Sequence, residues 1–205
     1  QTVVAFNRLT GAEVWKAGDA AQPGYSAPMI YTICGRRQLV AWHPEGLTGH
    51  EPATGAILWS VPFPAKSGMS ITTPVLSGNR LAVSSQFGGA TMIEFSPNNV
   101  APKVLWHASA NGNAPEKPFM HAGLNTPMST LIFREGHLYG VSTYGETCCL
   151  DANTGERVWT TLAMTSGGDV PKDRWFSVFM TLHGDRVFVF SESGDLIIAR
   201  FSPKG

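Results

Sequence analysis

His121 and Asn125 are the two residues whose types and spacing best suit chemistry, because they lie four positions apart in one long loop segment. A histidine titrates near neutral pH and can act as a general base. An asparagine amide oxygen can bind calcium, and a bound calcium ion can polarise an ester or lactone carbonyl. The alternative is a solvated histidine beside a turn-forming asparagine, and the sequence leaves both interpretations open.

Cys148 and Cys149 are a second candidate, because they are adjacent. Neighbouring side chains of a strand point to opposite faces, so the pair is interpreted as two strand residues, one of them buried as a small hydrophobic side chain. The alternative is a strained disulfide between the two neighbours. Cys34 is the third cysteine of the chain, and so low a count excludes a disulfide-built scaffold.

Other catalytic motifs do not occur in the sequence. It contains no Gly-x-Ser-x-Gly nucleophile elbow, no His-Glu-x-x-His, no Cys-x-x-Cys and no phosphate-binding loop. His43 and Glu45 flank Pro44, and we interpret them as a hydrogen-bonded surface pair rather than a catalytic dyad.

Composition narrows the classes of partner. The 205 residues include 15 Lys and Arg and 15 Asp and Glu, without a run of either sign. Neither nucleic acid nor an anionic membrane surface is therefore an expected partner. No apolar run approaches the roughly 20 residues that span a bilayer. A hydrophobic content of 43% favours one domain with a substantial core over residues 1–205.

The elements that would position any site are defined by a repeat. Thr-Gly-x-x-x-Trp occurs three times, ending at Trp15, Trp59 and Trp159, and a degenerate copy without Thr-Gly ends at Trp106. Short β-branched and aromatic runs between turn residues favour strands, and copies whose tryptophans are 44, 47 and 53 residues apart indicate propeller blades. We predict an all-β propeller of four-stranded antiparallel blades, about four to five in this chain, with residues 176–202 as a final incomplete blade.

Closure of the ring is left open by this count. Residues near Val3 to Trp15 can complete the blade that begins at Val178, or the chain is a half-propeller completed by a second copy or by a further segment. In either case, the repeated tryptophan is predicted to fill the wedge between neighbouring blades, while the Thr-Gly turn reverses the chain tightly.

The channel mouth is the default ligand site of a propeller, and it is formed by the loops that lead into the innermost strands. Alignment of the repeats places several side chains in such loops. The predicted ligand-binding residues are Tyr25, Met69, Ser70, Asn125, Arg174 and Trp175. Two long loops, from Ala108 to Leu124 and from Thr161 to Arg174, are expected to cover part of the mouth.

Two stretches of the sequence, from Ala5 to Trp15 and from Cys149 to Trp159, resemble the repeat of a known family. Both stretches carry a small or apolar residue, Asp or Asn, and then Thr-Gly-x-x-x-Trp. This pattern resembles the tryptophan-docking repeat of pyrroloquinoline-quinone-like propellers, including uncharacterised secreted members from environmental bacteria, and it spans nearly the whole chain. The resemblance implies a periplasmic or secreted protein. The superfamily with this repeat includes both eight-bladed quinone dehydrogenases and non-catalytic scaffolds such as the outer-membrane assembly lipoprotein.

The sequence departs from the dehydrogenases of that superfamily. Those enzymes combine an Asp base, Glu and Asn ligands for calcium, and a vicinal disulfide stacked on the quinone. Here no matching Asp base can be assigned, and Cys148-Cys149 leads directly into a Thr-Gly turn. Pyrroloquinoline quinone is therefore not an expected cofactor.

The expected function is a scaffold that binds a small molecule or a protein at its mouth, with homodimerisation as a further expectation. The alternative is a calcium-dependent hydrolase of lactones or esters, with His121 as base and Asn125 as metal ligand, which rests on fold-level analogy. A quinone-dependent dehydrogenase is the third and least favoured interpretation.

Overall fold

The structure, a computed structural model, describes residues 2–108, 123–165 and 176–205. Within these ranges it consists of antiparallel β-strands and one short 3-10 helix, η1 (Lys66–Gly68). The described residues contain no helix long and apolar enough to cross a membrane. The predicted all-β propeller of antiparallel blades is confirmed.

Three complete blades have four strands each, hydrogen-bonded in chain order. The first complete blade comprises β3 (Met29–Ile33), β4 (Arg36–His43), β5 (Gly46–His50) and β6 (Ile57–Pro62). The next comprises β7 (Val75–Ser77), β8 (Arg80–Ser85), β9 (Gly89–Ser96) and β10 (Asn99–Ala108). The third comprises β11 (Ile132–Arg134), β12 (His137–Val141), β13 (Thr147–Asp151) and β14 (Arg157–Thr161).

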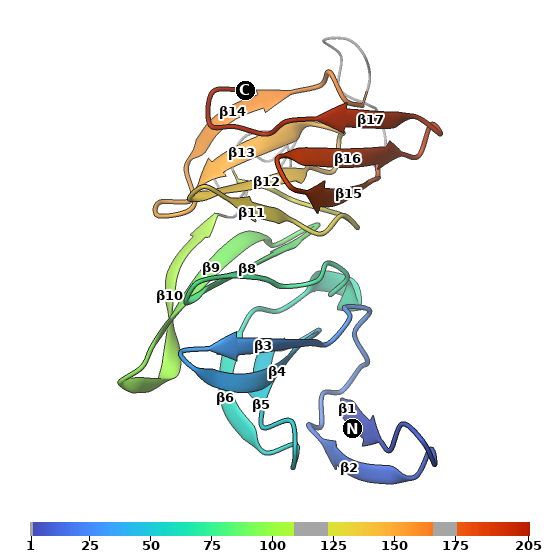
Figure 1. The fold of residues 1–205 in the computed structure, drawn as a ribbon, viewed down its shortest axis with the longest axis vertical. Coiled ribbons are helices and arrows are strands. Elements are labelled where there is room, and N and C mark those ends of the chain that lie inside the picture. Colours follow the sequence, from blue (N-terminus) through green and yellow to red (C-terminus); the bar gives the residue numbers. More distant parts are fainter. Residues whose placement is uncertain (1, 109–122, 166–175) are drawn as a thin grey trace.

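Two smaller sheets flank these blades. A two-stranded sheet is formed by β1 (Val3–Phe6) and β2 (Glu13–Ala17), and a three-stranded sheet by β15 (Val178–His183), β16 (Arg186–Ser191) and β17 (Leu196–Ala199). The sheets follow one another along an arc, with the two smaller ones at its opposite ends (Figure 1).

The arrangement bears on ring closure. Among the described residues, β1 and β2 pair only with each other, and β2 adds no fourth strand to the sheet of β15 to β17. Closure by the residues near Val3 to Trp15 is therefore not the geometry adopted, because Trp15 packs with Val3 against Leu39 and Ala41 of β4. Completion by a second copy stays a prediction, which the mass of the protein in solution would test.

The core lies between successive sheets, because strands buried on both faces bring apolar side chains to both of their neighbours. One cluster fills the interface between the first two complete blades, with Trp42 and Leu47 on one side and Val83 and Ile93 on the other. Two further clusters fill the following interfaces. Cys148 and Cys149 are buried free thiols of β13 that belong to different clusters, so they face opposite sides of their strand.

The Thr-Gly turns have a defined local structure between the third and fourth strands. Asp151 Oδ1 accepts hydrogen bonds from the amides of Asn153 and Thr154, at 2.6 and 3.1 Å, and Gly155 N donates to Asp151 O at 2.8 Å. Partial burial opposes ionisation of Asp151, but the amide hydrogen bonds outweigh it and lower the pKa of its carboxyl. Gly155 has a φ of +75°, which glycine adopts without steric cost.

Two of the repeated tryptophans, Trp15 and Trp106, join their blade to the Thr-Gly turn of the next one. Trp15 Nε1 donates to Pro52 O at 3.0 Å, and Trp106 Nε1 donates to Ala152 O at 2.9 Å. The ring of Trp106 lies against Gly155, where an added Cβ would come within 2.7 Å of it. Trp159 Nε1 donates to Ser202 O at 2.9 Å, in the segment after β17, which contains no Thr-Gly turn. The predicted role of the tryptophan between blades therefore holds at these three interfaces.

Candidate functional site

The ends of the blades define two faces of the molecule. In a four-stranded antiparallel blade, the loop that leads into the first strand and the turn between the second and third strands lie at one end. We call the side formed by these segments the mouth-side face. The turns between the first and second strands and between the third and fourth strands, including the Thr-Gly turns, form the opposite face.

Four of the predicted site residues lie in described loops of the mouth-side face. Tyr25 precedes β3, Met69 and Ser70 precede β7, and Asn125 precedes β11. Tyr25 N donates to Ser70 O at 3.0 Å, so loops of neighbouring blades are joined there. His121, Arg174 and Trp175 lie outside the described residues.

Tyr25 is the prominent exposed residue of this face, with 74% of its surface accessible. Its neighbour Ser26 anchors the loop, because Ser26 Oγ donates to Thr72 O at 2.9 Å. Met128, in the loop before β11, is also exposed, and the ammonium of Lys66 lies 5.4 Å from the centre of the Phe87 ring. The mouth-side face therefore presents aromatic and methionine side chains, and hydrogen bonds to the next blade hold the backbone around Tyr25 in place.

Asn125 and Ser70 are buried rather than exposed. Asn125 Nδ2 donates to Gln86 O at 3.0 Å, and Thr143 Oγ1 donates to Asn125 O at 3.0 Å, so Asn125 joins two blades. Several buried atoms of this cluster have no hydrogen-bond partner among the described residues: Ser70 Oγ, both polar atoms of the Gln86 side chain, Asn125 Oδ1 and Thr126 Oγ1. Such groups cost free energy unless they bind water or a small polar ligand.

The predicted calcium site finds limited support in this geometry. Within the described ranges, Asn125 Oδ1 accepts no hydrogen bond, but these ranges also contain no group of three His, Cys, Asp or Glu side chains that could hold a metal. Metal binding by Asn125 and base catalysis by His121 stay predictions, which metal analysis and lactone turnover with and without chelator would test.

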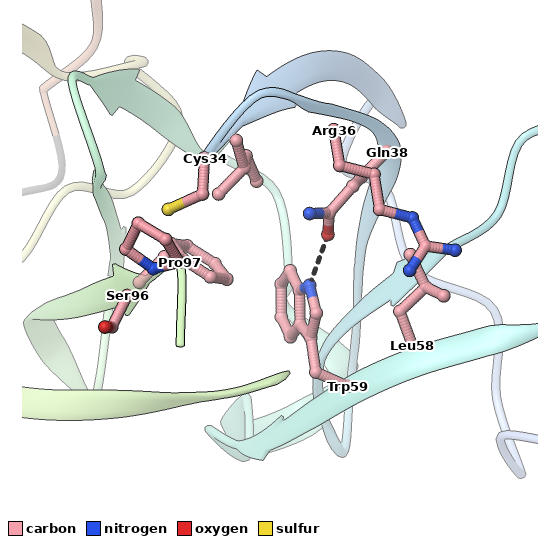
Figure 2. Close-up of a pocket in the computed structure, with 9 residues that line it drawn as sticks. Cys34, Arg36, Gln38, Leu58, Trp59, Ser96 and Pro97 are labelled. Atoms are coloured by element: carbon pink, nitrogen blue, oxygen red, sulfur yellow. Dashed lines mark hydrogen bonds between the residues drawn. The ribbon is translucent and has the colours of Figure 1, made fainter. Parts of the chain in front are cut away.

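The opposite face contains a pocket that sequence reasoning missed. A cavity of about 210 Å³ lies between the first two complete blades, at the tryptophan of β6. We call it the Trp59 pocket, and it is lined by Ile33, Cys34, Arg36, Gln38, Leu58, Trp59, Phe95, Ser96 and Pro97. Figure 2 shows the indole of Trp59 bonded to Gln38, with Cys34 and Pro97 to one side of the ring.

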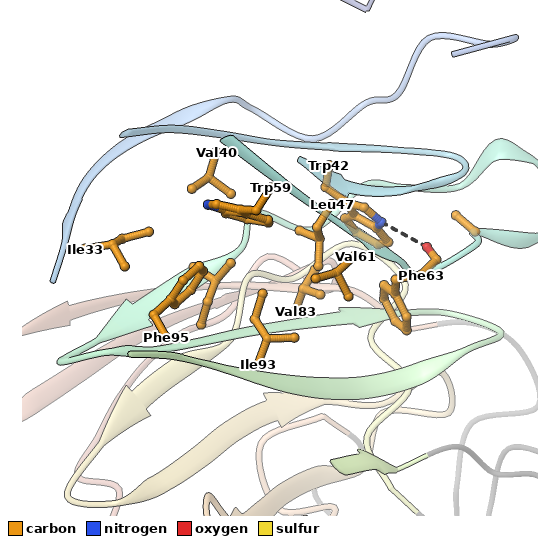
Figure 3. Packing of buried hydrophobic residues seen from close by; sticks show 12 residues of the cluster. Ile33, Val40, Trp42, Leu47, Trp59, Val61, Phe63, Val83, Ile93 and Phe95 are labelled. Atoms are coloured by element: carbon orange, nitrogen blue, oxygen red, sulfur yellow. Dashed lines mark hydrogen bonds between the residues drawn. The ribbon is translucent and has the colours of Figure 1, made fainter. Parts of the chain in front are cut away.

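Trp59 is bonded within its own blade and does not dock like the other three tryptophans. Its Nε1 donates to Gln38 Oε1 of β4 at 2.7 Å, and its ring meets Phe95 edge-on, with centroids 5.1 Å apart. Figure 3 shows the ring between Val40 and Phe95 within the core.

The hairpin facing Trp59 explains this exception. Ser96 pairs directly with Asn99, so the third and fourth strands of that blade are joined by a tight two-residue turn. The Thr-Gly turn found at the other blades is absent there. The sequence does contain a signal for this pocket, because the repeat copy that ends at Trp106 lacks the Thr-Gly pair.

The charges at the rim of the pocket come from Arg36 and Glu51. Arg36 Nη2 lies 2.8 Å from Glu51 Oε2, and both side chains are partly exposed. The hydrogen bond from Arg36 lowers the pKa of the Glu51 carboxyl. An exposed pair of this kind contributes little to stability, so Arg36 can change partners at small cost.

The three cysteines differ in their expected reactivity. Cys34 is exposed, whereas burial raises the pKa of Cys148 and raises that of Cys149 to about 11. Since the thiolate is the reactive form, we expect maleimide at pH 7.5 to label the native protein once, at Cys34. The unfolded, unreduced protein should be labelled at all three positions, as mass spectrometry would show. A single label after unfolding would instead indicate a disulfide between Cys148 and Cys149.

Antiparallel four-stranded blades joined by docked tryptophans define this protein as a β-propeller of the pyrroloquinoline-quinone-like repeat class. The profile of one family, described as outer membrane protein assembly factor BamB, matches residues 1–114 and again residues 101–204. The chain therefore belongs to this family, which confirms the predicted resemblance. No curated protein matches the sequence significantly.

Three solved structures are similar in fold. BamB from Moraxella catarrhalis has 17% identity and a TM-score of 0.58, over 93% of this chain and 52% of that one. The computationally designed protein Ika4 has 11% identity and a TM-score of 0.61, over 94% of this chain and 100% of the design. The designed Ika8 has 12% identity and a TM-score of 0.62, over 98% of this chain and 52% of the design. This chain thus spans about half of the BamB and Ika8 chains.

Proposed function

We propose that this propeller is a non-catalytic scaffold that binds another protein through its mouth-side face. The observation that supports this most is Tyr25, a large aromatic side chain exposed on a loop whose backbone is held by the next blade. Tyrosine is enriched among the residues that dominate binding energy at protein interfaces, and methionine is enriched at interfaces generally. A braced loop also loses little conformational entropy on binding.

Family membership indicates the class of partner. The family is described as an outer membrane protein assembly factor, so we propose a partner among the proteins of outer membrane assembly. Such a partner would meet this protein outside the cytoplasm, so we also propose a periplasmic or secreted location. The similar structures support the scaffold but not a particular partner, because identities of 11–17% indicate the fold alone.

A photo-crosslinking amino acid at position 25 tests the proposal in the cell envelope. We expect a discrete adduct with one protein from position 25 and none from position 9, because Leu9 is similarly exposed, at 81%, but lies in a turn of the opposite face. The affinity of the purified partner should then fall at least about tenfold in Tyr25→Ala, as for an interface hot spot. Equal crosslinking from both positions, or an unchanged affinity, would contradict binding at this face.

A further inference from the structure

The Trp59 pocket lies where the regular docking of one blade on the next is interrupted. At the interface between the second and third complete blades, the docked turn makes three contacts. Trp106 Nε1 bonds to Ala152 O, the ring of Trp106 lies against Gly155, and Arg80 Nη1 bonds to Asn153 Oδ1 at 2.7 Å. Through these contacts, Trp106 and Arg80 bind a backbone carbonyl, a glycine and an amide side chain of the turn.

The Trp59 pocket presents the same three groups without the turn. Trp59 supplies an indole N–H and a ring from the repeat position that Trp106 holds in the following blade, but here the indole is turned into its own blade, against Gly49 and Gln38. Arg36 corresponds to Arg80, because each begins the second strand of its blade and pairs with the last residue of the first strand. With no Thr-Gly turn to meet, Arg36 bonds to Glu51 and the indole bonds to Gln38.

We propose that the Trp59 pocket binds a glycine-containing β-turn of a partner protein, of the Asn-Thr-Gly type that the third complete blade supplies internally at residues 153–155. A carbonyl of the bound turn accepts the indole N–H of Trp59, its glycine lies against the ring, and Arg36 exchanges Glu51 for the amide or carboxylate side chain of the turn. Gln38 Oε1, released from the indole, is then free to accept a backbone N–H.

The size of the pocket fits this ligand. Its volume of about 210 Å³ is smaller than the roughly 300–1,000 Å³ of sites for drug-sized molecules and cofactors. A few backbone atoms and one small side chain match it better than a quinone. This inference is independent of the mouth-side face, because the pocket lies at the opposite end of the blades.

The experiment titrates the 15N-labelled full chain with a cyclic hairpin peptide that contains Asp-Ala-Asn-Thr-Gly-Glu, the sequence of residues 151–156. We expect the indole N–H resonance of Trp59, assigned with Trp59→Phe, to shift saturably while the other indole resonances stay. We also expect the labelling rate of Cys34 to fall several-fold in the complex. The matched control peptide has valine in place of glycine, and it should produce no shift because its side chain would meet the ring.

Two variants make the test specific. Arg36→Leu should weaken binding of the peptide several-fold. Replacing residues 96–103 with a copy of residues 151–156 should fill the pocket from within and abolish the response. If the variant with this replacement does not fold, the pocket of the unaltered chain can be blocked by a bulky maleimide attached to Cys34. This adduct should diminish the response to the peptide.

Several results would overturn the proposal. These are no shift of the Trp59 resonance at several millimolar peptide, an equal response to the valine peptide, or an undiminished response of the Cys34 adduct. A Trp59 shift that depends on protein concentration without peptide would assign the pocket to a second copy of this chain and would also overturn it.

Discussion

Trp106→Ala is expected to lower the free energy of unfolding by about 2–4 kcal/mol, near the lower end of the range for removal of a large aromatic side chain, since Trp106 is only half-buried. The substitution removes the ring that packs on Gly155 and the hydrogen bond to Ala152 O. Chemical denaturation followed by circular dichroism would measure the change.

Trp106→Phe is the matched control for this substitution. It keeps an aromatic ring in the wedge but loses the indole N–H, so the loss should be smaller, about 1–2 kcal/mol, from one hydrogen bond and a partly filled site. If Trp106→Ala cost no more than a typical surface substitution, the tryptophan would not hold the two blades together.

Gly155→Ala is expected to destabilise the protein far more than Gly11→Ala, although the two glycines occupy the same position of the repeat. Their φ angles are +75° and +71°, so both substitutions incur the same left-handed backbone cost, roughly 1–2 kcal/mol. Of the two, only Gly155 is covered by a ring: its added Cβ would lie 2.7 Å from Trp106, whereas no atom of the described residues lies within 4 Å of a Cβ on Gly11.

Overpacking adds about 1–3 kcal/mol to the cost at Gly155. Thermal and urea unfolding of the two variants, each compared with the unaltered protein, would show the difference directly. Equal destabilisation would mean that the glycine is needed for the turn alone and that the tryptophan does not require it.

Much of the fold was predictable because its determinants are local. The Thr-Gly turn, the tryptophan four residues after its glycine and the short β-branched runs are all visible in the sequence, and each defines one strand or turn. The partners of Trp15 and Trp106 follow from the repeat, since each of these tryptophans meets the Thr-Gly turn of the next blade. Closure of the ring was not predictable, because it depends on where Trp15 packs rather than on any residue pattern.

The sites were less predictable, because they depend on contacts between blades. Tyr25 is exposed as expected of a ligand-binding residue, whereas Ser70 and Asn125 are buried, and Asn125 braces the loops instead of lining an open surface. Periodicity alone cannot distinguish these cases, since all three precede an innermost strand. The bond between Trp59 and Gln38 joins residues of two non-adjacent strands, and only the fold brings them together.

The central claim is that three tryptophans dock on the next blade while Trp59 is held by Gln38 beside an open pocket. The most direct test is the indole N–H spectrum of the 15N-labelled Gln38→Met variant, in which the side chain keeps its length but loses the amide acceptor. We expect the Trp59 indole resonance to move upfield and its hydrogen exchange to accelerate, with the resonances of Trp15, Trp106 and Trp159 unchanged. An unchanged Trp59 resonance would contradict the account, because it would mean that Gln38 does not accept the hydrogen bond of this indole.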